Sequence, residues 1–189
     1  MSSRETILNR IKGVGSASVQ LPEPAENRAV EESYLSLFTE SLKTAGAEVI
    51  QLPEGSDAFD FVFGNYPDVI RFDSTDNWKK YGQECPLSEL NILESVLITG
   101  KLSVAENGAI WVDNTCFPHR IIPFITQHLI LKVNVKELVP TMHEAYQHIS
   151  FDNVSYGVFI AGPSKTADIE QSLVIGAHGP KALTVIIEF

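Results

Sequence analysis

The sequence predicts an α/β protein whose sheet is mostly parallel, partly mixed and flanked by helices. From residue 30 onward, short apolar runs alternate with stretches whose apolar residues recur at helical spacing, which is the pattern of parallel strands joined by crossover helices. Three apolar runs, at residues 94–98, 102–105 and 109–112, follow one another with only turn residues between them. Such a passage without helices indicates that part of the sheet is mixed.

The chain is expected to divide into two parts. Residues 2–12 have helical spacing with Ile7, Leu8 and Ile11 on one stripe, and residues 13–27, with two prolines, have the composition of a linker. We therefore expect an N-terminal helix and linker over residues 1–29, which docks on the body, docks on a partner or frays. Residues 30–189 are expected to form one α/β domain, because 189 residues with 44% hydrophobic content can bury a core.

The other elements follow from the same patterns. A helix is predicted over residues 30–45, where apolar side chains recur every four residues up to Gly46. A capping box formed by Asn134 and Glu137 predicts another helix there, and residues 165–175 are predicted as the last helix. A helical turn is predicted at residues 57–63 and a surface connection at residues 73–86. The predicted strands are residues 48–52, 69–72, 94–98, 102–105, 109–112, 128–133, 157–161 and 183–189.

Composition excludes several classes of function. The net charge of −10 argues against a nucleic-acid partner, because phosphate contacts need clustered Lys and Arg. The two cysteines lie far apart without a paired motif, so we expect no metal site and no cysteine-bound iron–sulfur cluster in this chain. No stretch has the character of a signal peptide or a membrane span. We expect a cytoplasmic protein.

A turn before the predicted last helix is the first candidate site. Gly162 permits close backbone approach, and the hydroxyls of Ser164 and Thr166 are available to cap N–H groups or to meet an anion. Asp168, in the first turn of that helix, would repel a phosphate that faced it. Two interpretations stay open, a well-capped strand-to-helix joint and a ligand site. His178, at the far end of the helix, either handles protons or caps the helix.

A second candidate is the turn Glu106, Asn107 and Gly108 between two apolar runs. Its glutamate is either an ordinary surface residue of a hairpin or a carboxylate held where the backbone approaches closely. Ligands of α/β sheets bind at the carboxyl ends of strands. If the two turns form one site, Glu106 must therefore lie beside Ser164 and Thr166, while the length of a helix would keep His178 away.

These two stretches also carry a family resemblance. The run GPSKTADIEQSLVIGAHGPKALTVII at residues 162–187 closely resembles the C-terminal signature of the LUD (lactate-utilisation) domain family, of the lactate-utilisation protein C type. The second family-like stretch is ITGKLSVAENGAI at residues 98–110. Family members usually have Ala-Glu-Thr-Gly where this chain has Ala-Glu-Asn-Gly at residues 105–108, so Asn107 keeps a polar side chain but not the hydroxyl. The resemblance covers residues 30–189.

The resemblance has implications for both fold and site. It implies a NagB/RpiA/CoA transferase-like fold, in which glutamates at comparable loops act as nucleophile or base. Glu106 is accordingly the candidate catalytic residue. The candidate ligand-binding residues are Asn107, Gly108, Gly162, Ser164, Thr166, Asp168 and His178.

The function that the resemblance implies is a non-redox component of bacterial L-lactate utilisation, the oxidation of L-lactate to pyruvate. Its iron–sulfur clusters would belong to separate partner subunits, and this chain would hold no cofactor of its own. The alternative, from the residues themselves, is an autonomous enzyme or sensor that binds a small carboxylate or phosphate metabolite at the glycine turns.

Overall fold

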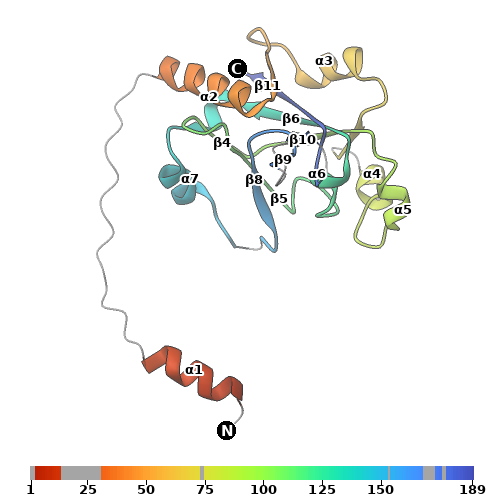
Figure 1. Cartoon of the computed structure of the whole chain (residues 1–189). Helices are drawn as coiled ribbons and strands as arrows, with labels where there is room; N and C mark the ends of the chain where they lie inside the picture. Colours follow the sequence, from red (N-terminus) through yellow and green to blue (C-terminus); the bar gives the residue numbers. More distant parts are fainter. Residues whose placement is uncertain (1–2, 14–30, 73–74, 153, 168–172, 176–177) are drawn as a thin grey trace.

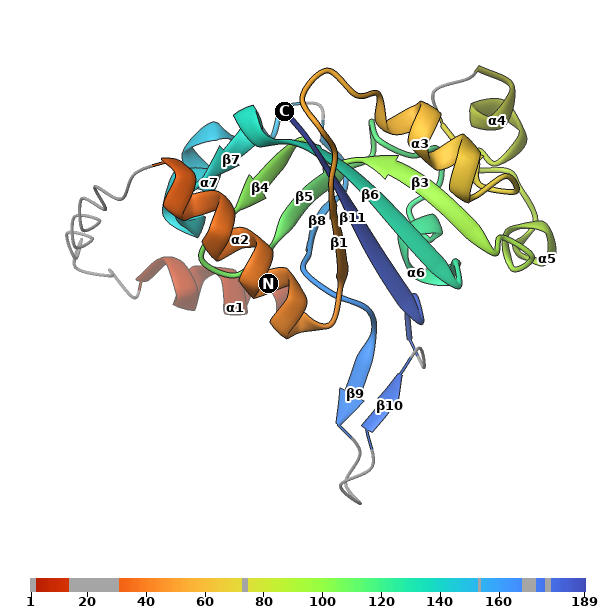
Figure 2. The same cartoon turned by 90° about the horizontal axis from the view of Figure 1, so that it is seen from above.

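The computed structural model describes residues 3–13, 31–72, 75–152, 154–167, 173–175 and 178–189. Its centre is a five-stranded sheet in which all neighbouring strands are parallel (Figure 2). The strands, in spatial order, are β1 (Glu48–Gln51), β11 (Ala182–Glu188), β6 (His128–Asn134), β3 (Ser95–Thr99) and β2 (Ile70–Arg71).

A second, mixed sheet packs on one face of the parallel sheet. The pairing of β4 with β7 is parallel, while β5 runs antiparallel to both β4 and β8. Its strands, in spatial order, are β7 (Leu138–Val139), β4 (Leu102–Val104), β5 (Ile110–Asp113) and β8 (Gly157–Ile160). The expected α/β body, mostly parallel and partly mixed, is thus confirmed, with the mixed strands forming a sheet of their own.

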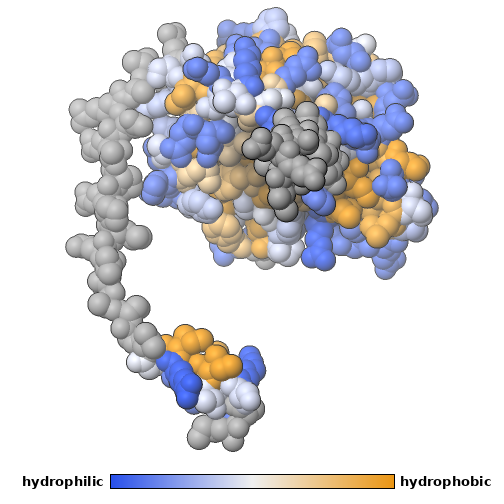
Figure 3. All heavy atoms as spheres, viewed as in Figure 1, coloured by the Kyte–Doolittle hydropathy of each residue, from blue (hydrophilic) through white to orange (hydrophobic). Residues whose placement is uncertain are grey.

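Helices flank both sheets (Figure 1). The helices are α1 (Ser3–Gly13), α2 (Glu31–Ala45), α3 (Ala58–Asn65), α4 (Thr75–Lys80), α5 (Leu87–Leu90), α6 (Ile122–Ile125) and α7 (Met142–His148), with a 3₁₀ turn, η1 (Val135–Glu137). The predicted N-terminal helix corresponds to α1, none of whose residues is buried. Figure 3 shows its apolar side chains gathered on one side. The predicted linker lies outside the described residues.

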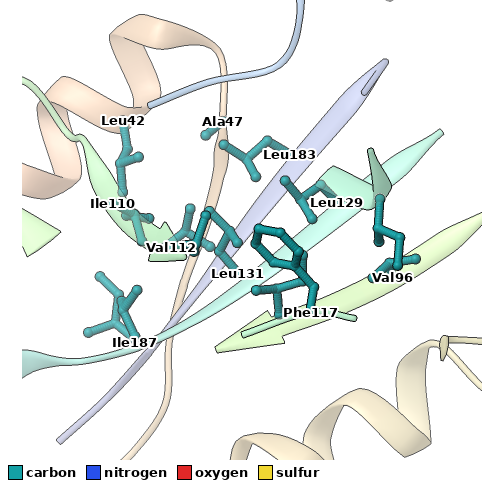
Figure 4. Close-up of a cluster of buried hydrophobic side chains, with 14 of the residues drawn as sticks. Leu42, Ala47, Val96, Ile110, Val112, Phe117, Leu129, Leu131, Leu183 and Ile187 are labelled. Atoms are coloured by element: carbon teal, nitrogen blue, oxygen red, sulfur yellow. The ribbon is translucent and has the colours of Figure 1, made fainter. Parts of the chain in front are cut away.

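The core has layers because side chains alternate along the central strands. Val96 and Ile98 of β3 join the cluster between the two sheets, whereas Leu97 faces the opposite side, where α3 covers it. Figure 4 shows the inter-sheet cluster, to which α2 adds Leu42. A third cluster, on the outer face of the mixed sheet, is covered by Ala145 of α7. The parallel sheet is therefore buried on both faces, as such sheets usually are.

The prediction of a helix over residues 165–175 is wrong. The described part of this segment forms two strands, β9 (Lys165–Ala167) and β10 (Leu173–Ile175), paired antiparallel and projecting from the body (Figure 2). Short apolar runs do not distinguish helix from strand by spacing alone. The β-branched Thr166, Val174 and Ile175 favour extended backbone.

The helix predicted from Asn134 begins later in the chain. The Asn134 side chain does accept the N–H of Lys136, at 2.9 Å, but it caps only η1 before the chain enters β7. Helix α7 starts after Pro140, with Thr141 as its cap and Glu144 in its first turn. Because proline lacks an N–H and clashes inside a helix, Pro140 separates the two elements.

Gly108 provides a test of the contact between α2 and the mixed sheet. It has φ +70°, and a Cβ added there would lie 3.0 Å from the backbone nitrogen of Leu42. We expect Gly108→Ala to reduce the free energy of unfolding by about 1–2 kcal/mol. Urea unfolding measures this change.

The matched control is Gly64→Ala in α3, where an added Cβ meets nothing within 4 Å. Because alanine is the better helix former, this change should raise the free energy of unfolding by about 0.5–1 kcal/mol. Equal effects of the two substitutions would contradict the close approach at Gly108.

Candidate functional site

Glu106 lies directly after β4 and is tied to the start of α7. Its Oε1 accepts the backbone N–H of Met142 at 2.7 Å, and its own N–H donates to the carbonyl of Pro140. The side chain of Asn107 accepts the N–H of Ala109, which closes the turn. The arrangement positions the Glu106 carboxylate firmly at the surface, on the β7 side of the mixed sheet.

The two family-like stretches lie at the same end of the β5–β8 pair. Ile110 lies opposite Ile160, and Gly108 and Gly162 each lie two residues beyond this last pair of the register. Both glycines abut the C-terminal half of α2, since a Cβ on Gly162 would lie 2.8 Å from the carbonyl oxygen of Ala45. Their lack of a side chain lets α2 pack closely on this end of the sheet.

The side chains of these stretches engage different elements. Ser164 lies against the turn before β11, where its N–H donates to the carbonyl of Pro180 at 2.9 Å. A hollow of about 290 Å³ is lined by Gly162, Ser164 and His178 together with apolar residues of β8 and α6. Glu106 does not line it. The structure thus groups His178 with Ser164, because the chain folds back as a hairpin instead of running on as a helix.

Of the two other predicted ligand-binding residues in this segment, Thr166 and Asp168, the structure describes only the first. Thr166 lies in β9, opposite Val174 of β10. Asp168 lies outside the described residues. The hydroxyl and carboxylate roles predicted for them stay predictions.

A second hollow, which we call the carboxyl-edge hollow, lies where β2 and β3 end. Its volume is about 240 Å³. It opens at the carboxyl ends of two parallel strands, the usual place for a ligand in an α/β sheet. The residues that line it are Phe59, Arg71, Phe72, Trp78, Leu97, Thr99, Lys101, Thr115 and Cys116.

Cations and aromatic rings share this hollow. The guanidinium of Arg71 stands 4.0 Å from the ring centre of Phe63 and 5.2 Å from that of Phe59. Stacking on aromatic faces orients a guanidinium, and its five N–H donors let it hold more than one partner at a time. Nearby, Lys132 pairs with Glu188 at 3.1 Å.

Asp113 organises the side of the hollow formed by the loop after β5. This carboxylate is buried and pairs with Lys101 at 2.7 Å, and it also accepts the N–H and the hydroxyl of Thr115. Burial by itself would raise the pKa of Asp113, but the hydrogen bonds from Lys101 and Thr115 outweigh it and lower the pKa. Burial raises the pKa of the Cys116 thiol, which is therefore protonated near neutral pH.

The carboxyl-edge hollow was not predicted from the sequence. Its polar residues come from separate segments, with Arg71 at the end of β2, Thr99 at the end of β3 and Thr115 after β5. No local motif joins them. The available signal was positional, since Arg71 lies near the end of one predicted strand and Thr99 directly after another, and residues in such positions meet at one edge of a parallel sheet.

A histidine at the opposite edge of the sheet is held in a hydrogen-bonded chain. His128 Nε2 lies 2.8 Å from the hydroxyl of Thr184, which donates to the carboxylate of Glu48 at 3.0 Å. The ring also packs edge-on against Tyr66. Burial lowers the pKa of His128, although the charge of Glu48 acts in the other direction. The folded protein thus favours the neutral imidazole.

This pKa shift predicts a loss of stability in acid. The unfolded chain takes up a proton at His128 near pH 6.5, before the folded protein does, so stability is lost as pH falls through and below that value. Urea unfolding between about pH 7 and about pH 5 should show this loss, and His128→Gln should reduce the slope. An unchanged slope in the variant would contradict the assignment.

Comparison with known proteins identifies the family. The fold defines an α/β protein in which a mixed sheet packs against a parallel sheet. Residues 86–187, more than half of the chain, match the family model of the LUD domain. The chain belongs to the LUD domain family. A crystal structure of a DUF162 family protein from Deinococcus radiodurans superposes with a TM-score of 0.63 at 18% identity, covering 85% of this chain and 99% of that one. At that identity the likeness concerns the fold alone.

Several relatives are named lactate utilization protein C. The one from Oceanobacillus iheyensis is 33% identical over 92 residues, which are 46% of this chain and 40% of that protein. The one from Shouchella clausii is 26% identical over 171 residues, which are 85% of this chain and 72% of that protein. The matched part of this chain thus spans less than half of the Oceanobacillus protein.

Two features are absent from the part of the chain that the structure describes. None of the helices described has both the length and the apolar character needed to cross a bilayer. Among the same residues, no three His, Cys, Asp or Glu side chains come together in an arrangement for a metal ion.

Proposed function

We propose that this protein is a cytoplasmic, non-redox component of bacterial L-lactate utilisation, the oxidation of L-lactate to pyruvate. The observation that carries the proposal is the match to lactate utilization protein C, which extends over 85% of this chain in one relative. The carboxyl-edge hollow supports it, because Arg71 and Lys101 suit an organic acid.

The proposal assigns electron transfer to separate iron–sulfur subunits. Oxidising a hydroxy acid to a keto acid releases two electrons, which need an acceptor. An iron–sulfur cluster is typically held by four cysteines, and this chain has two, Cys85 and Cys116, both with free thiols. A division of labour between this chain and cysteine-rich partners accounts for that composition.

Growth of a deletion strain on L-lactate tests the proposed role in lactate utilisation. Deleting the gene should abolish or strongly slow growth on L-lactate as the carbon source, with growth on glucose unchanged, and a plasmid copy should restore growth. Undiminished growth on lactate would refute the proposal. The purified chain should show no turnover of L-lactate with a dye acceptor, and robust turnover without partners would contradict the division of labour.

The same growth assay examines the proposed catalytic role of Glu106. In the plasmid copy, Glu106→Gln keeps an oxygen that accepts the N–H of Met142, so the start of α7 stays capped. Loss of growth with this variant would support a role for the charge in chemistry. Full growth would limit Glu106 to holding α7.

The alternative is an autonomous enzyme or sensor that binds a small carboxylate or phosphate. The hollow lined by Ser164 and His178 favours this alternative, because it adds hydroxyl and imidazole groups away from the carboxyl-edge hollow. A thermal-shift screen of lactate, sugar phosphates, folates and coenzyme A esters separates the two functions. A sugar phosphate, folate or coenzyme A ester that stabilises the chain more than lactate would favour the alternative.

A further inference from the structure

The carboxyl-edge hollow has an unusual charge for this protein. The chain carries a net charge of −10, yet the nine described residues that line the hollow include Arg71 and Lys101 and no acid. The net charge of the protein opposes long-range attraction of an anion, so recognition depends on local groups.

Lys101 has capacity for a ligand beside its partner. Its ammonium donates to Asp113, which is buried behind it, while 44% of the Lys101 side chain is exposed. An ammonium has three N–H donors, so the bond to Asp113 leaves others for an anion on the open side. Asp113 also accepts the hydroxyl of Thr115, so the Lys101 ammonium and the Thr115 hydroxyl are held near each other by the same carboxylate.

The other lining groups suit a hydroxyl or oxo group on a short carbon chain. Thr99 presents an exposed hydroxyl at the end of β3, and Thr115, which donates to Asp113, retains lone pairs that accept. The rest of the wall is mostly apolar and consists of Phe59, Phe72, Trp78, Leu97 and Cys116. A volume of about 240 Å³ is below the usual range for drug-sized ligands and fits a small acid.

We propose that the carboxyl-edge hollow binds a small monocarboxylate with a 2-hydroxy or 2-oxo group. The carboxylate lies at Arg71 and Lys101, the second oxygen at Thr99 or Thr115, and the carbon chain against the aromatic wall. This inference deepens the proposed function, and it rests on that function for the choice of L-lactate and pyruvate as probes.

Calorimetric titration of the full chain with L-lactate, pyruvate, propionate and inorganic phosphate tests the proposal. L-Lactate or pyruvate should bind, propionate should bind at least several-fold more weakly because it lacks the second oxygen, and added salt should weaken binding. Absence of binding by both L-lactate and pyruvate would overturn the proposal. Tighter binding of phosphate would overturn the assignment to a carboxylate.

Tryptophan fluorescence locates the ligand. The chain has two tryptophans, of which Trp78 lines the hollow, while Trp111 is buried in the mixed sheet. The ligand should change the fluorescence of the unmodified chain and not that of Trp78→Phe, which should still bind in the calorimeter. A fluorescence change that persists in Trp78→Phe would place the ligand elsewhere.

Variants then test the two recognition groups. Arg71→Gln should weaken binding of L-lactate at least tenfold, and Thr99→Val, which keeps the shape of the side chain, should reduce the preference for L-lactate over propionate. The control is Lys181→Met, which removes the same charge from an exposed position after β10. If Arg71→Gln and Lys181→Met bind equally well, the site is wrong.

Failure of this inference can be told from failure of the proposed function. Binding without a growth defect on lactate would leave the site standing and refute the pathway. A growth defect without binding would leave the pathway standing and refute the site.

Discussion

Burial of the parallel sheet on both faces is the constraint on which the rest of the structure depends. Successive side chains of β3, β6 and β11 enter opposite clusters, one between the sheets and one under α3. Removing apolar area from water stabilises the fold by roughly 25 cal/mol for each Å². A strand that is apolar on both faces needs a cover on each, and here a second sheet with α2 provides one cover while α3 provides the other.

This double cover confines polar chemistry to the edges of the sheet. At the carboxyl edge, Asp113 is buried yet fully engaged by Lys101 and Thr115, which offsets the cost of its desolvation. At the amino edge, the chain of His128, Thr184 and Glu48 does the same for an imidazole. The two edges differ in the space beside these polar groups. The carboxyl-edge hollow opens beside Lys101 and Thr115, whereas the ring of Tyr66 packs against His128 at the amino edge.

Most of the strands could be predicted from the sequence, because apolar runs bounded by turn residues are a strong local signal. The strands β3, β6 and β11 lie within one residue of the predicted ranges. The segment after Ser164 was predicted wrongly because its apolar spacing suits a helix as well as two short strands. The hairpin of β9 and β10 projects from the body, so its strand structure does not follow from packing against the core. Pro140 was a local signal that the prediction overlooked, and it explains why α7 begins at Met142 and not after Asn134.

The candidate sites show why a strong sequence motif need not mark a site of chemistry. Gly108 and Gly162 belong to the most recognisable stretches, and the structure explains both by the close packing of α2, whose backbone would meet any added side chain. A requirement for close packing makes a residue specific to a fold without giving it a part in a reaction. Arg71 lies outside both family-like stretches, while Thr99 and Lys101 lie in the second one without having been singled out, because a ligand needs these residues near one another in space and not in sequence. Their common feature is a position at or just after the carboxyl end of a strand of the parallel sheet, which becomes informative only when the strand order is known. In this fold, therefore, two glycines of the motifs let α2 pack closely on the sheet, and the strand order brings the polar groups together.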